Sequence, residues 1–226
     1  MIRNRLLLKE NQEEALVRIS PLLPLSIYLT DFSDHAYSSV RWHWHEDFQL
    51  CLVLSGKVSL HTAGNSYLIE KGNGFFINSR FAHSVDPAVP DSAYYCINFP
   101  PSLIVPEDDQ ALYRTVMLPF LSGQLPAVYL FDTDHPAGIR LIQTIRQIVR
   151  ISENEKIPGW ELLIHGAILS AWPDLFMLAD RTLSHDTVSS NVFNARLTRI
   201  MEFLQTHYPK KLTLSEIAAS IGLCPE

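Results

Sequence analysis

Cysteine is scarce in this sequence, and its few occurrences follow no metal-binding or disulfide pattern. The 226 residues contain three cysteines, Cys51, Cys96 and Cys224, and none of them belongs to a CxxC pair. An odd number of widely separated cysteines excludes a disulfide framework and a cysteine-based zinc site. Scattered, unpaired cysteines are typical of proteins whose thiols stay reduced, so we expect a cytoplasmic protein.

Long apolar runs are also missing. Near the N-terminus the uninterrupted apolar stretch is residues 6–8, which is too short for the apolar region of a signal peptide. No run approaches the roughly 20 apolar residues that a membrane-spanning helix needs. We therefore expect no association with a membrane.

A basic surface is lacking as well. The net charge is −6, and residues 1–135 hold nine Lys+Arg against fifteen Asp+Glu, whereas residues 184–226 hold four of each. An acidic surface argues against nucleic-acid contact by the N-terminal part. The sequence has no dinucleotide-binding fingerprint, P-loop or GxSxG motif, so the signals of nucleotide-binding proteins and serine hydrolases are absent.

What the chain does contain, between residues 25 and 100, is a series of short apolar or alternating segments. Turn signals such as Ser55-Gly56 and Ala63-Gly64-Asn65 separate them. Many short strands at close spacing predict a sandwich or barrel of antiparallel sheets. The predicted strands are residues 25–29, 40–45, 48–54, 58–61, 66–69, 75–77, 83–85 and 94–99.

Helical periodicity replaces the strand pattern after a proline-rich transition over residues 100–135, in which we predict one helix at 107–117. Apolar residues at helical spacing then predict a helix over 136–153 and a second from 160 to about 179. Pro173 is expected to kink the second helix or to end it near Trp172. A polar linker at 182–191 precedes a further predicted helix at 192–207.

The last fourteen or so residues combine a helix start with a helix stop. Thr213 and Glu216 have the spacing of a capping box, and Gly222 can adopt the left-handed conformation that ends a helix. A cap residue and a proline then open a second helix, which is the pattern of a helix-turn-helix. The second helix would begin where this chain ends. The candidate DNA-binding residues are Thr213, Ser215, Cys224, Pro225 and Glu226.

One polar constellation stands out in the strand-rich part. His43 and His45 share a strand face because the side-chain period is two, Gln49 and Cys51 follow with the same parity, and His83 comes from another strand. A metal ion could be held by His43, His45, Gln49 and His83, but an amide is a poor ligand for transition metals. We favour a pocket that hydrogen-bonds a small polar ligand over a metal site or a hydrogen-bonded core. No cofactor is expected.

The same residues carry a resemblance to known proteins. The stretch His43-x-His45-x3-Gln49-x6-Gly56 resembles the first cupin motif, and residues 72–83, which end in His83, resemble the second. Residues 161–165 and 214–223 resemble the AraC/XylS family of transcription regulators. The resemblance covers nearly the whole chain and implies an α+β fold. Its parts would be a cupin-like antiparallel β-barrel (a double-stranded β-helix), a helical dimerisation or linker region and a partial all-α helix-turn-helix.

Two departures from these motifs affect the functional expectation. Gln49 replaces the cupin glutamate, which weakens an enzymatic interpretation, and Asn78-Ser79-Arg80 replaces the usual proline-containing turn. The implied domains are an effector-binding domain at 1–135, a linker or dimerisation region at 136–183 and a partial DNA-binding domain at 184–226.

The resemblance implies an effector-responsive transcription regulator and no enzyme. Its barrel would bind a small polar molecule, such as a sugar, through His43, His45, Gln49, Cys51 and His83. Helices 137–151 and 160–178 would form a homodimer, and the full-length protein would bind specific DNA. Two alternatives stay open: a metal-dependent cupin enzyme, either an oxygenase or an isomerase, and a cupin interaction module that never binds DNA.

Overall fold

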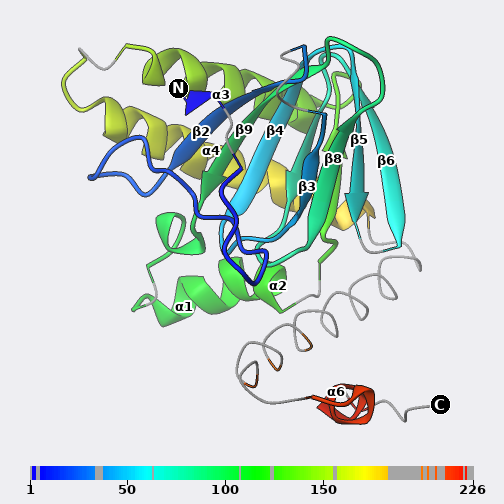
Figure 1. Ribbon diagram of the computed structural model, residues 1–226. Helices are drawn as coiled ribbons and strands as arrows, with labels where there is room; N and C mark the ends of the chain where they lie inside the picture. Colours follow the sequence, from blue (N-terminus) through cyan, green and yellow to red (C-terminus); the bar gives the residue numbers. More distant parts are fainter. Residues whose placement is uncertain are drawn as a thin grey trace.

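The computed structural model describes residues 2–3, 6–33, 38–62, 64–106, 108–122, 125–154 and 157–182, and in the C-terminal part residues 200, 203, 207, 212–220 and 222. Two sheets and two long helices contain most of these residues (Figure 1). The architecture is therefore mixed, with antiparallel sheets and helices, as the sequence predicts.

The strands form a six-stranded sheet in the order β1-β2-β9-β4-β7-β10 and a four-stranded sheet in the order β3-β8-β5-β6. Neighbours are antiparallel in both sheets, except for the parallel pair of β1 and β2. All eight predicted strands are confirmed, whereas β1 and β10 were missed, and β10 lies inside the proline-rich transition. The larger sheet contains β1 (Ile2–Arg3), β2 (Ser26–Asp31), β9 (Ala93–Phe99), β4 (Phe48–Ser55), β7 (Gly74–Ile77) and β10 (Val128–Phe131), and the smaller contains β3 (Val40–His43), β8 (His83–Pro87), β5 (Lys57–Thr62) and β6 (Asn65–Glu70).

The two sheets do not close into one barrel. Within the described part of the chain, no strand ladder joins the larger sheet to the smaller one. One edge of the smaller sheet is β3, which has four residues and an irregular register against β8, so it offers little backbone for a further ladder. The two sheets instead face each other across a shared apolar cluster that includes Val53, Phe75, Leu60 and Val85.

Side-chain parity along β4 explains how the larger sheet is covered on both faces. Phe48, Leu50 and Leu52 are buried in the cluster that includes the helices. Gln49 and Cys51 are buried on the opposite face, toward the smaller sheet. A strand that is covered on both faces has a nearly continuous apolar sequence. The polar Gln49 is the exception in this run, and parity places it between the two sheets.

The outer face of the larger sheet is covered by α3 (Pro136–Ser152) and α4 (Trp160–Thr182), which also pack on each other (Figure 1). Both predicted helices are thus confirmed. The apolar stripe of α3 is buried within the chain, because it contacts the sheet and α4. This stripe consists of Leu141, Ile142, Ile145, Ile148 and Val149.

The helix α4 continues through Pro173, so of the two predicted outcomes the end near Trp172 is wrong, and the kink stays a prediction. Pro173 is exposed, while Trp172 and Leu175 are buried in the core. Their packing stabilises the helix although the proline removes one backbone hydrogen bond. By length and composition alone, Trp160–Ala179 could cross a membrane, contrary to the expectation from the sequence, and 50% of this segment is buried in the fold.

The segment between β9 and β10 contains several short helical segments instead of one helix. These are η1 (Pro101–Leu103), α1 (Gln110–Leu112), the π-helical η2 (Tyr113–Met117) and α2 (Leu118–Leu121). Asp109 caps α1 by accepting a hydrogen bond from the amide of Leu112 at 3.1 Å. The predicted helix at 107–117 therefore exists as two helical segments of different type.

At the C-terminus the structure confirms the predicted cap and turn. The amide of Glu216 donates to Oγ1 of Thr213 at 3.3 Å, and the amide of Thr213 donates to Oε2 of Glu216 at 2.8 Å. The helix that follows is α6 (Leu214–Ser220), and Gly222 has φ +73°. The linker at 182–191 and the helix at 192–207 lie outside the described residues, apart from 182, 200, 203 and 207, as do Cys224, Pro225 and Glu226. The predicted domain boundaries stay predictions.

Candidate functional site

Three histidines meet in the interior between the two sheets. His43 on β3 lies directly opposite His83 on β8, and His45 follows two residues after His43. The ring centroids of His43 and His83 are 4.2 Å apart, and those of His45 and His83 are 5.2 Å apart. One ring nitrogen from each residue lies within 4.8 Å of the other two. The structure therefore brings together the three histidines that the sequence singles out.

A register irregularity in β3 is needed to place His43 in this interior. Val40 and His43 are both buried, although an odd number of positions separates them and a regular strand would put them on opposite faces. The pairing with β8 shifts between these two residues, as at a β-bulge. The bulge turns the second half of β3, so that His43 joins Val40 on the buried side.

Each of the three rings is held by one hydrogen bond from Nδ1 to a backbone carbonyl. His43 bonds to the carbonyl of Arg41, His45 to that of Asp47 and His83 to that of Phe81, each at 2.8 Å. A carbonyl oxygen only accepts hydrogen bonds, so these contacts place the proton on Nδ1. The lone pair of each Nε2 is then available, and Nε2 of His45 and of His83 has no hydrogen-bond partner among the described residues.

Burial keeps the three rings neutral at physiological pH. Burial, together with the smaller effect of the neighbouring His45, lowers the pKa of His43 to about 3. The pKa of His45 and that of His83 are also below their ordinary value because both rings are removed from water. The cluster is therefore three neutral imidazoles that expose their Nε2 lone pairs.

Gln49 and Cys51 lie in the same interior as the histidines. Gln49 belongs to a separate set of side-chain hydrogen bonds, which includes Cys96 and Asn98. The Gln49 amide donates to Sγ of Cys96 at 2.6 Å, and that thiol donates to Oδ1 of Asn98 at 3.3 Å. Oε1 of Gln49 has no partner among the described residues. Cys51 lies opposite Cys96 on the neighbouring strand, and burial raises the pKa of its thiol well above the ordinary value. A thiol held protonated in this way is unreactive.

The structure adds Glu14, which the sequence did not single out. Its carboxylate lies 3.7 Å from Nε2 of His43, and its side chain is 5% exposed. Burial and the nearby Asp47 raise the pKa of Glu14 to about 7. The surrounding N-terminal segment has no strand or helix pattern, so no periodic signal points to this residue. Its place depends on contacts with residues some thirty positions away.

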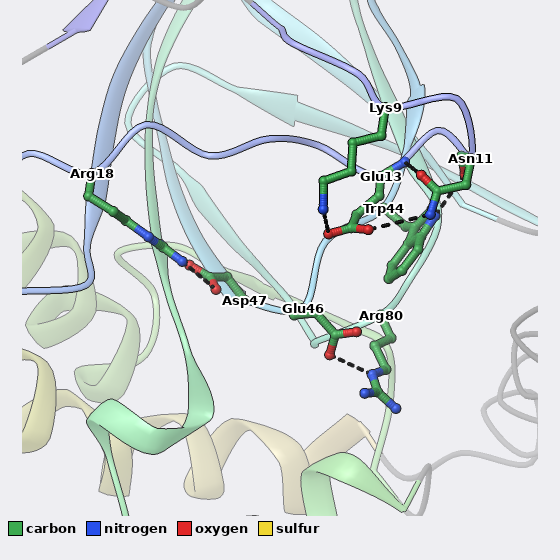
Figure 2. Close-up of polar contacts among 8 residues, drawn as sticks. All are labelled: Lys9, Asn11, Glu13, Arg18, Trp44, Glu46, Asp47 and Arg80. Atoms are coloured by element: carbon green, nitrogen blue, oxygen red, sulfur yellow. Dashed lines mark hydrogen bonds and ion pairs between the residues drawn. The ribbon is translucent and has the colours of Figure 1, made fainter. Parts of the chain in front are cut away.

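Hydrogen bonds attach the N-terminal segment to the turn between β3 and β4, and Figure 2 shows those that Asn11 and Arg18 make there. The amide of Glu14 donates to the carbonyl of Trp44 at 2.8 Å, and the Trp44 indole donates to the carbonyl of Asn11 at 3.1 Å. The Arg18 guanidinium forms two hydrogen bonds with the Asp47 carboxylate, at 2.5 and 3.1 Å. We call residues 7–18 the arm, and these bonds hold its Glu14 beside the histidines.

Of the predicted DNA-binding residues, the structure describes Thr213 and Ser215. The hydroxyl of Thr213 donates to Glu216 at 2.8 Å and accepts from its amide, so it serves the helix cap. Ser215 is exposed on α6. The roles of both in DNA binding stay predictions.

Comparison with known proteins identifies the N-terminal part of the chain. A family model described as the AraC-like ligand binding domain matches residues 24–164. YdeC of Bacillus subtilis strain 168, an uncharacterized HTH-type transcriptional regulator, is 25% identical over 198 residues. The aligned region is 87% of this chain and 66% of YdeC, so the chain spans somewhat less than two thirds of that relative.

Solved structures with detectable likeness are more distant. Apo ToxT K231A from Vibrio cholerae is 10% identical with a TM-score of 0.45, and covers 88% of this chain and 71% of its own. The AraC-like transcriptional activator CuxR is 14% identical with a TM-score of 0.39, and the match covers 79% of this chain and 57% of CuxR.

The family match extends over well over half of the chain, from the start of β2 into α4, and includes the three histidines and Gln49. It confirms the resemblance to the AraC/XylS family. The chain belongs to the family of AraC-like ligand binding domains.

Proposed function

We propose that this chain is the sensor part of an AraC-type transcription regulator, and that it binds a small polar effector between its two sheets. The observation that carries the proposal is the buried cluster of His43, His45 and His83, in which Nε2 of His45 and of His83 has no hydrogen-bond partner among the described residues. Buried polar atoms without partners destabilise a fold by about 1–3 kcal/mol each, so such a cluster favours a bound partner. Gln49, with a free carbonyl oxygen, would complete the polar lining.

The polar residues between the two sheets favour ligand binding over catalysis. The position that holds a carboxylate in the first cupin motif is occupied by Gln49, whose amide is bonded to Cys96. Cys51, the remaining predicted ligand-binding residue, is fully buried and held as a thiol. We therefore propose a sensor in preference to a metal-dependent oxygenase or isomerase.

We further propose that the regulator acts as a homodimer, through the outer face of α4. This face carries the exposed apolar residues Leu162, Leu169 and Met177 at helical spacing, with exposed fractions of 75%, 41% and 43%. Apolar helix faces of this kind favour association with a second copy. In the full-length protein, the helix-turn-helix that begins at Thr213 would read DNA in the cytoplasm, with two copies facing two half-sites.

The effector site is tested by thermal unfolding with a library of small polar compounds, including sugars. A true effector at one hundred times its Kd stabilises the folded state by about 2.7 kcal/mol. The shift should disappear in His83→Gln and persist in His61→Gln, because His61 pairs with Asp86 at 3.2 Å and is partly exposed. A compound that stabilises both variants equally would place the pocket elsewhere.

The dimer is tested by sedimentation equilibrium. Leu162→Glu should shift the protein toward monomer, since it places a charge in the proposed apolar interface. Leu68→Glu is the matched control, because Leu68 is 58% exposed on the edge strand β6. Equal effects of the two substitutions, or a monomeric wild type at the highest concentration, would contradict the proposed interface.

A further inference from the structure

The outer face of the smaller sheet carries a row of polar side chains and one tryptophan. Side chains alternate along β5, so His61 points outward while both of its chain neighbours are buried. Directly opposite His61 lie Ser66 on β6 and Ser84 on β8. The edge strand β3 adds Trp42, which is 48% exposed. The row therefore extends across the sheet from β6 to β3.

Together with Asp86 of β8, these side chains line a groove of about 500 Å³, which we call the outer groove. Small-ligand sites have volumes of about 300–1,000 Å³, so the outer groove is large enough for one molecule of the size of a sugar. Its lining combines one aromatic ring with hydroxyl, imidazole and carboxylate groups. An aromatic surface beside a few polar groups is the usual composition of a small-ligand site.

The polar side of the outer groove is held in place by contacts of His61 with two partners. Its Nε2 lies 3.2 Å from Oδ2 of Asp86, and its Nδ1 lies 2.8 Å from Oγ of Ser66. A carboxylate only accepts hydrogen bonds, so the proton of a neutral His61 belongs on Nε2, and Nδ1 then accepts from the Ser66 hydroxyl. The Ser66 oxygen and the Asp86 carboxylate, whose side chain is 49% exposed, can both accept hydrogen bonds from a ligand.

The charges at the outer groove disfavour an anionic ligand. The ionisable residues of its described lining are His61 and Asp86, which lie against each other. Lys57, a cation on the same face of β5, is bonded to Glu70 at 2.6 Å. An incoming phosphate or carboxylate would therefore meet the negative charge of Asp86 without a lysine or arginine in the described lining to offset it.

Trp42 supplies the apolar surface that a sugar ring needs. The face of an indole carries partial negative charge, so it attracts the slightly positive C–H groups on one side of a pyranose. The hydroxyl groups at the edge of the sugar can donate to Asp86 and Ser66 and can exchange hydrogen bonds with Ser84. An uncharged ring with an apolar face and hydroxyl groups at its edge therefore matches both the aromatic and the polar side of the outer groove.

We propose that the outer groove is a second small-molecule site and that it binds an uncharged sugar ring. The inference goes beyond the proposed sensor function, because the outer groove and the three histidines lie on opposite faces of the smaller sheet. Along β8, Ser84 lines the outer groove, whereas the adjacent His83 belongs to the interior cluster. The two sites thus share a strand, and a substitution in one leaves the side chains of the other in place.

The experiment is an NMR titration of the 226-residue chain with methyl glucoside, methyl galactoside and maltose. The indole N–H resonance of Trp42, assigned from its loss in Trp42→Phe, reports on the outer groove, and the backbone amide of Ser84 reports on it in the variants. At least one of the three sugars should shift both resonances with a Kd of about 0.1–10 mM. Inorganic phosphate and choline chloride are the anionic and cationic comparisons, and both should bind more weakly.

Substitutions on the exposed face separate the two sides of the outer groove. Trp42→Ala removes the stacking surface and should weaken sugar binding at least about tenfold. Asp86→Asn keeps the size of the side chain but removes the charged acceptor, so it should weaken binding about fivefold. Leu68→Ala is the matched control, because Leu68 is exposed on the same face of β6 and does not line the outer groove. It should change the Kd less than about twofold.

Two results would overturn the inference: no shift of the Trp42 indole by any of the three sugars up to about 20 mM, or tighter binding of phosphate or choline than of every sugar. Sugar binding that persists in Trp42→Ala and disappears in His83→Gln would refute the outer groove and support the interior pocket. Binding that disappears in Trp42→Ala and persists in His83→Gln would support the outer groove, even if no compound binds between the sheets. Circular dichroism checks the fold of each variant.

Discussion

The ion pair between Arg18 and Asp47 should contribute substantially to stability, because one of its partners is almost fully buried. The side chain of Asp47 is 3% exposed and that of Arg18 is 33% exposed. Removing one partner from a fully buried pair costs about 3–5 kcal/mol, whereas exposed pairs are worth about 0–1 kcal/mol. Since the arginine is partly solvated, we expect Arg18→Ala to lower the free energy of unfolding by about 2–3 kcal/mol.

Urea unfolding followed by tryptophan fluorescence measures this loss, because the Trp44 indole contacts the arm. At a slope of about 2 kcal/mol per molar urea, the midpoint should fall by about 1–1.5 M. Glu46→Gln is the matched control (Figure 2), because Glu46 and its partner Arg80 are 51% and 53% exposed. The control should change stability by less than about 1 kcal/mol.

A double-mutant cycle separates the ion pair from other effects of the substitutions. The stability loss in Arg18→Ala should be partly recovered when Asp47→Asn is added, because the amide no longer leaves a buried charge unpaired. A loss below about 0.5 kcal/mol in Arg18→Ala, or additive effects of the two substitutions, would refute the argument that burial of Asp47 makes this pair strong.

Four further predictions concern other parts of the chain. Gly138→Ala should destabilise the protein by more than about 2 kcal/mol in urea unfolding, because a Cβ there would lie 2.1 Å from a backbone oxygen of the preceding turn. Phe120→Ala should cost about 3–5 kcal/mol in the same assay, since the ring is 1% exposed and packs among other aromatic rings; Leu118→Ala, at an exposed site of α2, is its control. Thr213→Ala should speed hydrogen exchange in α6 by removing the cap with Glu216, worth about 1 kcal/mol, while Thr213→Ser should not. Unfolded His43 has its pKa near 6.5 and folded His43 near 3, so acidification protonates the unfolded state first. The wild type should thus lose about 2 kcal/mol more stability between pH 7 and pH 5 than His43→Gln, and an equal loss in both would contradict the neutral, buried ring.

Local patterns in the sequence predicted much of the fold. The apolar run at 48–54 predicted the strand β4, and the capping box of Thr213 and Glu216 is present with both reciprocal bonds. The parity of His43 and His45 correctly placed both rings in one interior. These features depend on residues a few positions apart, and for this reason a single sequence reveals them.

Features that depend on distant residues were missed or predicted incorrectly. The four residues of β10 become a strand because they pair with β7, some fifty positions earlier. The helix α4 passes Pro173 because its buried side is packed against the rest of the core. The position of Glu14 beside His43 depends on hydrogen bonds between the arm and Trp44. In each case tertiary contacts overrule the local signal, and no periodicity reports them.

The core that α3 and α4 share with the larger sheet determines how the protein can be shortened in the laboratory. A version that ends before α3 would expose the apolar face of Phe48, Leu50, Phe76 and Tyr129, which these helices and α2 now help to cover. Such a face would promote aggregation and low solubility. A fragment for crystallography or ligand screening should therefore retain the chain at least through α4, whether or not it also retains α6.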